Sequence, residues 1–186
     1  WALIPAILKI KFNTNEILTS LMLTYVALFI LDYCVVGPWK DPAGYGLPKS
    51  MTFPDAGRLP VLFDGLRVHI GVYFAIIICF ITYIVYNKTL FGFKLKVSGL
   101  SSKASQYAGF KYKNLIFYTF IISGACAGLA GLFEVSGPIG LLYRDISPNY
   151  GFTAIIVAFL GRLNPFGIIL SSLLTVSYTH LTLPTR

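Results

Sequence analysis

The chain has 186 residues, of which 56% are hydrophobic and 12% charged, and its mean hydropathy is +0.73 with a net charge of +8. In soluble domains about a quarter of the residues are charged. The hydrophobic residues here form long blocks and do not show the periods of about 2 or 3.6 residues that half-buried strands and helices have. These features exclude an ordinary soluble domain and predict an all-α integral membrane protein built as a multi-span helical bundle.

The first block, "WALIPAILKI", is too short to cross a bilayer and lacks the marks of a signal peptide. We expect it to be the end of a helix that begins upstream. The next block, residues 15–36, would extend about 33 Å as a helix, which exceeds the roughly 30 Å of a hydrocarbon core. Residues 68–86 and 115–133 are uncharged and close to the minimum length for a span. Three spanning helices are therefore predicted.

The orientation follows from the lysines, because positive residues in short loops stay on the cytoplasmic side. Residues 87–114 contain six lysines and no acid, so this loop is predicted to be cytoplasmic. The outer loop is then 37–67, which has five prolines and should form turns and extended chain.

The last third departs from simple spans, because "FTAIIVAFL" is too short to cross and "GRLNPFG" interrupts the pattern. Residues 152–174 should form either one broken helix or two half helices that enter and return, as beside substrate paths in transporters. The alternative is a plain cytoplasmic turn in which Arg162 obeys the positive-inside rule. For substrate contact the candidates are two aromatic and two tip residues: Phe152, Phe159, Asn164 and Pro165.

The final segment, residues 176–186, is neither apolar enough for a helix nor charged like a juxtamembrane tail. It resembles the peptide encoded by a sequencing adapter, and we expect it to be non-native. The partial membrane domain is then 1–175, incomplete at both ends.

Within the cytoplasmic loop, residues 101–108 have the length of a short surface helix. Ser101 and Ser102 are suited to cap its start and Gly109 to end it. Ala104 and Ala108 are four residues apart and share one face, on which another protein could lie closely. Contact of the lysines with anionic lipid headgroups is the alternative for this loop, but it does not account for the small residues.

The segment "GLSSKASQYAGFKYKNLIFYTFIISGACAGLAGLFEVSG" resembles the signature of permease subunits of ABC importers, in the group for branched-chain amino acids, simple sugars and nucleosides. The residues that match the family's ATPase-coupling segment are Gly99, Ala104, Ala108, Gly109 and Phe110. Ser101 and Ser105 stand where the family usually has Asn and a second Ala. The outer loop and "GRLNPFG" resemble the nucleoside or simple-sugar branch most closely.

The resemblance implies a multi-pass protein of the cytoplasmic membrane that forms the translocation pathway. It implies three protein partners: an ATP-binding cassette ATPase, a second permease subunit, identical or related, and an extracytoplasmic substrate-binding lipoprotein. This chain would bind no cofactor itself, because ATP and magnesium would be held by the ATPase.

The helix after the loop is rich in small residues that allow close packing in lipid. Its two small-xxx-small pairs are Gly124 with Gly128 and Ala127 with Gly131. They suit packing within one subunit or at the seam of a permease dimer.

Catalytic and metal residues are not expected, because the chain offers no carboxylate pair, His cluster or Ser-His-Asp order. His69, Asp32 and Glu134 are interpreted as membrane-boundary residues. Two alternatives of other classes remain: a secondary transporter or channel not driven by ATP, which should bury an ionisable residue near mid-membrane, and an intramembrane enzyme.

Overall fold

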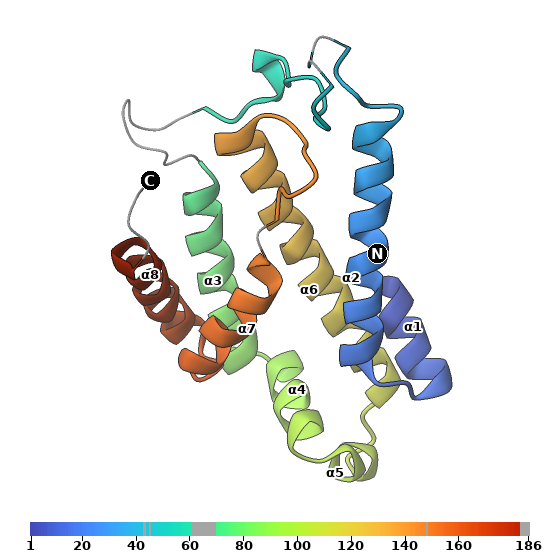
Figure 1. The fold of residues 1–186 in the computed structure, drawn as a ribbon. Helices are drawn as coiled ribbons and strands as arrows, with labels where there is room; N and C mark the ends of the chain where they lie inside the picture. Colours follow the sequence, from blue (N-terminus) through green and yellow to red (C-terminus); the bar gives the residue numbers. More distant parts are fainter. Residues whose placement is uncertain (43, 45, 61–69, 148, 183–186) are drawn as a thin grey trace. The chain divides into compact units, whose positions relative to one another are not determined.

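The computed structural model describes residues 1–42, 44, 46–60, 70–147 and 149–182. Across these residues the secondary structure is helical, with two isolated β-bridges and no strand (Figure 1). The protein is therefore an all-α membrane protein, as the hydropathy predicted.

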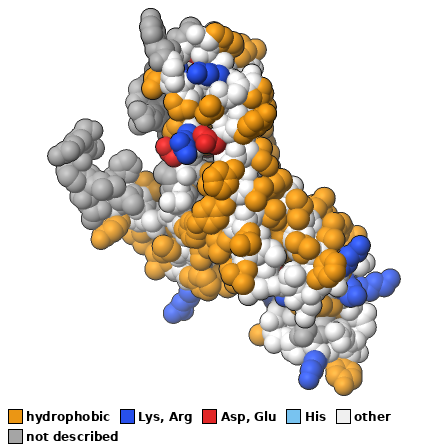
Figure 2. All heavy atoms as spheres, turned by 45° about the vertical axis from the view of Figure 1, so that its right-hand side comes forward, with side chains coloured by type: hydrophobic (Ala, Val, Ile, Leu, Met, Phe, Trp, Pro, Cys, Tyr) orange, Lys and Arg blue, Asp and Glu red, His pale blue; other side chains and the backbone are white. Residues whose placement is uncertain are grey.

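Among the described residues, three helices are long and apolar enough to span a membrane: α2 (Glu16–Val36), α3 (Gly71–Lys88) and α6 (Tyr112–Glu134), which continues into a π turn, η2 (Val135–Ile139). Most of their side chains are exposed, and hydrophobic side chains cover the middle of the face shown in Figure 2. Such a surface requires lipid or further protein around it. Residues 68 and 69 of the second predicted span lie outside the described residues.

The chain forms two compact units, of which the first comprises residues 1–72 and 96–146. In this unit α1 (Leu3–Phe12) packs against α6 and α2. Asn13 adopts a left-handed conformation (φ 52°) that ends α1, and the side chain of Asn15 caps α2 by accepting a hydrogen bond from the Ile17 amide (2.9 Å). A 2.7 Å ion pair between Lys9 and Glu16 joins the two helices across this turn.

The outer loop of the first unit is ordered by backbone pairing with the segment that follows α6. The Ser50 amide donates to the Leu142 carbonyl and the Phe53 amide to the Gly140 carbonyl, both at 2.8 Å. Apart from one 3-10 turn, η1 (Asp55–Gly57), the described part of this loop has no helix, in line with its proline content. The result is a small cap over the C-terminal ends of α2 and α6, which the sequence predicts to lie on the outer side (Figure 1).

The second unit comprises residues 73–95 and 147–186. It contains most of α3, the start of α4 (Leu90–Leu100), and two helices that pack on each other, α7 (Tyr150–Leu160) and α8 (Pro165–Thr182) (Figure 1). The interrupted segment is thus a helical hairpin that turns back at residues 161–164, and not one broken helix. The helix α8 continues to Thr182, so the expectation that residues 176–186 are too polar to continue a helix is wrong for 176–182. Whether residues 176–186 are native stays a prediction.

Candidate functional site

The short helix α5 (Ser102–Tyr107) is fixed at its start by a side-chain cap. Ser101 has an extended backbone, and its hydroxyl oxygen accepts a hydrogen bond from the Ala104 amide (3.2 Å). Such a cap satisfies one of the amide donors that every helix start leaves free. The side chain of Ser102 is not among the parts that the structure describes.

The end of α5 is fixed by a pair of backbone hydrogen bonds. Gly109 adopts a left-handed conformation (φ 73°), its amide donates to the Gln106 carbonyl, and the Phe110 amide donates to the Ser105 carbonyl, each at 3.0 Å. This is the Schellman arrangement, in which glycine meets no Cβ penalty. Both ends of α5 are therefore closed by local contacts, which holds a helix of only six residues in place.

The surface of α5 and its flanks combines exposed apolar side chains with the polar Lys103 and Gln106. Ala104 and Ala108 are both exposed, as the predicted docking face requires, and no atom lies within 4 Å of a Cβ added at Gly99. Two large side chains flank them: Tyr107 is 93% exposed and Leu100 is 89% exposed. Sequence reasoning missed Tyr107 and Leu100, although a large apolar residue beside a helix cap in a predicted cytoplasmic loop was a usable signal.

The interior side of this junction depends on Ser105, which is fully buried. Its hydroxyl lies 2.8 Å from that of Ser98, which joins the last turns of α4 to α5. The sequence marked Ser105 as a departure from the family pattern, and here the departure has a structural use.

A second candidate site is the tip of the α7–α8 hairpin, where two glycines let the backbones touch. A Cβ at Gly161 would lie 2.7 Å from the Gly167 carbonyl carbon, and one at Gly167 would collide with the Gly161 carbonyl oxygen. Further along, the buried Ser171 hydroxyl donates to the Val157 carbonyl (2.8 Å). The two helices of the hairpin are therefore held together at the turn, by Gly161 and Gly167, and again at the Ser171–Val157 hydrogen bond.

The turn itself contains two consecutive non-glycine residues with positive φ, Arg162 (53°) and Leu163 (55°). Their amides donate to the Phe159 and Ala158 carbonyls at 3.0 and 2.9 Å, which ends α7. Asn164 then caps α8, because its Oδ1 accepts from the Phe166 amide (3.2 Å).

The four predicted substrate residues do not form one group. Asn164 and Pro165 lie at the tip, and Asn164 borders a hollow of about 410 Å³. Phe152 and Phe159 are exposed on α7 and do not line that hollow. The hollow is instead lined by Leu160, Gly161, Arg162, Asn164, Gly167, Leu170, Ser171 and Leu174.

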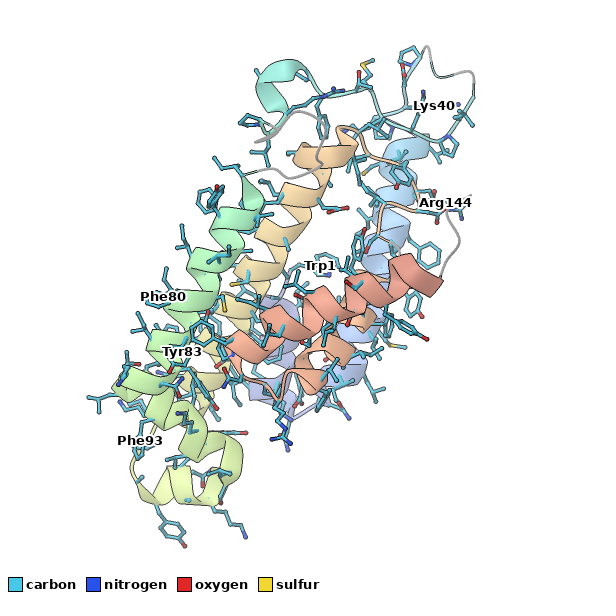
Figure 3. All side chains as sticks on the ribbon, turned by 90° about the vertical axis from the view of Figure 1, so that its left-hand side faces the viewer. Trp1, Lys40, Phe80, Tyr83, Phe93 and Arg144 are labelled. Carbon is cyan, nitrogen blue, oxygen red and sulfur yellow. The ribbon has the colours of Figure 1, made fainter. Side chains whose placement is uncertain are left out.

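The hairpin tip lies against α3 within the second unit. The Cys79 thiol donates to the Pro165 carbonyl (3.2 Å), and the rings of Tyr83 and Phe166 have centroids 4.7 Å apart. Figure 3 shows Tyr83 beside the end of α8 at which the hairpin turns. These α3 residues were not predicted, since contacts between residues so far apart in the chain leave no pattern in one sequence.

The predicted packing residues of α6 divide into two groups. At Gly124 an added Cβ would collide with the Ala2 side chain, so α1 packs on this glycine. At Gly128 and Gly131 no atom lies within 4 Å, and Ala127 is exposed. Gly124 is thus a packing position inside the first unit, whereas Ala127, Gly128 and Gly131 face open space.

The outer cap carries a hollow of about 570 Å³ with mainly apolar walls. Its lining includes Trp39, Lys40, Met51, Phe53 and Leu142. Beside the cap, Arg144 Nε lies 3.5 Å from Asp32 Oδ1, so the predicted boundary residue Asp32 has an ionic partner. Within the described residues, no group of three His, Cys, Asp or Glu side chains could hold a metal ion.

Residues 1–185 match the family described as "Branched-chain amino acid transport system / permease component". The chain is 38% identical to the glucose ABC transporter permease protein TsgB13 of Haloferax volcanii, over 87% of this chain and 45% of that protein. It is 32% identical to the guanosine ABC transporter permease protein NupP of Bacillus subtilis, over 94% of this chain and 51% of that one.

A third relative is the nucleoside ABC transporter permease protein NupB of Lactococcus lactis, 30% identical over 92% of this chain and 49% of that protein. The chain therefore spans about half the length of the curated relatives it matches. No solved structure matches it significantly.

Proposed function

We propose a function on one premise: this chain belongs to the family of branched-chain amino acid transport system permease components. It is part of the membrane-spanning subunit of an ATP-driven importer, and it forms a section of the translocation pathway. Its place is the cytoplasmic membrane, which it crosses several times, with residues 87–114 on the inner side. The positive charge of that loop supports this orientation.

The observation that carries the proposal is the exposed, doubly capped helix α5. Tyr107 and Leu100 expose large apolar side chains in a lysine-rich loop, next to Ala104 and Ala108. Exposed apolar groups with a polar rim are typical of protein interfaces. We infer that an ATPase subunit, which would hold ATP and magnesium, docks on this surface and moves α5 and α4 together through the Ser98–Ser105 contact.

The solute is proposed to be a sugar or nucleoside, because the relatives are named for glucose, guanosine and nucleosides. Both kinds of molecule are neutral and rich in oxygen or nitrogen acceptors. Asn164 and Pro165 at the hairpin tip, with Phe152 and Phe159 on α7, remain our candidates for its path, since half-helix ends and aromatic faces suit such a ring.

Two further partners belong to the proposal. An extracytoplasmic substrate-binding protein would dock on the outer cap, whose hollow carries Trp39, Met51 and Phe53. A second permease subunit, identical or related, would pack on the open small residues of α6, Ala127, Gly128 and Gly131, since small residues allow close helix approach in lipid.

The test is ATP-driven uptake of guanosine and of glucose by the full-length permease, reconstituted with its cognate ATPase and substrate-binding protein. Tyr107→Ala and Ala104→Trp should abolish co-purification of the ATPase and ATP-driven uptake. The control is Tyr33→Ala, because Tyr33 is also largely exposed but lies at the outer end of α2. Uptake that persists without the ATPase would instead support a secondary transporter or channel.

A further inference from the structure

The hairpin tip packs beside α3, one of the described helices that are long and apolar enough to span a membrane. The helix α7 has 11 residues and extends about 16 Å, roughly half of a hydrocarbon core. Independently, Pro165 contacts Cys79, the ninth of the 18 residues of α3, and Phe166 contacts Tyr83 one turn further in. The α3 contacts put the start of α8 beside the middle and the inner half of α3, and α7 is too short to cross a bilayer alone, so we interpret the hairpin as re-entrant.

The charge at this depth belongs to Arg162, whose side chain is exposed. Its backbone is left-handed (φ 53°), a conformation that favours glycine and costs about 1–2 kcal/mol per residue for other side chains. The turn thus keeps a strained Arg where glycine would fit without strain. Retained strain of this kind is a pointer to function.

No carboxylate within its own unit neutralises Arg162. The sequence of residues 73–95 and 147–186 contains no Asp or Glu, and all seven acids of the chain lie in the first unit. In the described residues, no ion pair involves Arg162. A charge within a membrane span is costly unless it faces water or a partner, and the exposed Arg162 side chain lies on the rim of a hollow with room for water.

We propose that Arg162 faces the aqueous solute pathway and acts there as an electrostatic barrier that keeps protons and metal cations from crossing with a neutral solute. The inference rests on the proposed transport function. A fixed positive charge acts strongly on a cation in a narrow space with a low effective dielectric constant, and arginines or helix-dipole ends exclude protons and cations in other pores. A permease that opens for neutral solutes needs such a barrier to preserve the membrane potential.

The experiment compares Arg162→Gln, Arg162→Lys and wild type in the full-length, assembled transporter in proteoliposomes. A potassium diffusion potential, negative inside, drives cations inward, while trapped dyes report lumenal pH and sodium during ATP-driven solute transport. Arg162→Gln should raise the proton and sodium leak about tenfold or more, whereas Arg162→Lys should stay near wild type. The control Lys11→Gln removes an exposed inner-side charge from α1 and should leave the leak unchanged.

An Arg162→Gln transporter that moves solute without added leak would overturn the barrier. Failure of the proposed function is a separate result, since wild type would then show no ATP-driven uptake at all. If Arg162→Gln does not assemble, a second measurement tests the proposal. A nitroxide spin label is attached at Arg162→Cys after Cys34, Cys79 and Cys126 have been replaced, and its accessibility is measured. Stronger collision with a water-soluble nickel chelate than with oxygen supports the pathway position, and the reverse would assign Arg162 to lipid and overturn it.

Discussion

Ser98 and Ser105 share a 2.8 Å hydrogen bond that connects α4 to α5, and Ser105 is the fully buried partner. Ser105 directly follows Ala104 and lies three residues before Ala108, the two small residues of the exposed face. A displacement of α5 by a docked protein is therefore passed to α4 through a side-chain contact as well as through the chain.

A double-mutant cycle tests that connection. Ser98→Ala and Ser105→Ala should each lower the stability of the junction by about 1 kcal/mol, and the double variant should lose no more than either one. Hydrogen exchange of the α5 amides in the full-length protein reports the loss. Additive losses would show that the two hydroxyls act independently.

Alanine at the hairpin glycines should destabilise the protein. Gly161→Ala and Gly167→Ala force two backbones apart and should each cost about 1–3 kcal/mol, measured as a drop in thermal unfolding temperature in detergent. Gly151→Ala is the matched control, because nothing lies within 4 Å of its Cβ position in α7. There the lower entropy of alanine in the unfolded chain should leave stability equal or higher.

Alanine substitutions at two adjacent serines on α8 should have different effects on the free energy of unfolding. Ser171 donates across to the Val157 carbonyl, whereas the Ser172 hydroxyl donates to Ile169 in its own helix. Ser171→Ala should lose about 0.5–1.5 kcal/mol of unfolding free energy, and Ser172→Ala little. Equal effects for the two variants would contradict the cross-hairpin bond.

The Asp32–Arg144 pair should make a small, salt-dependent contribution. Arg144 is largely exposed, so its loss in Arg144→Gln should cost about 1 kcal/mol or less. Exchange of the two residues, Asp32→Arg with Arg144→Asp, should recover part of what each single change loses. Limited proteolysis of the outer cap at low and high salt measures the effect, and an unchanged cleavage rate in Asp32→Asn would argue against the pair.

What the sequence predicted well was local. The apolar blocks indicated helices, although α6 begins three residues before the predicted 115 and α3 extends to Lys88, whose long side chain can reach the interface. Ser101 and Gly109 were readable as caps because caps depend on residues three to six positions apart.

The sequence could not show two kinds of feature: contacts between residues far apart in the chain, and strained backbone conformations. The Cys79–Pro165 contact joins residues 86 positions apart, and one sequence carries no signal for it. Arg162 in a left-handed turn departs from the preference for glycine, so a rule based on propensity would not find it. The division of α6, with Gly124 covered and Gly128 open, likewise depends on where α1 packs.

The re-entrant hairpin also has a consequence for biogenesis. The bond from Ser171 to Val157 spans 14 residues, so the hairpin can close soon after its second half leaves the ribosome. The surface of α3 that contacts the hairpin has already been synthesised by then, because Cys79 precedes Pro165 by 86 residues. Synthesis from the N-terminus therefore delivers the receiving helix first, and a short polar turn that could not remain in lipid alone has a protein surface to receive it.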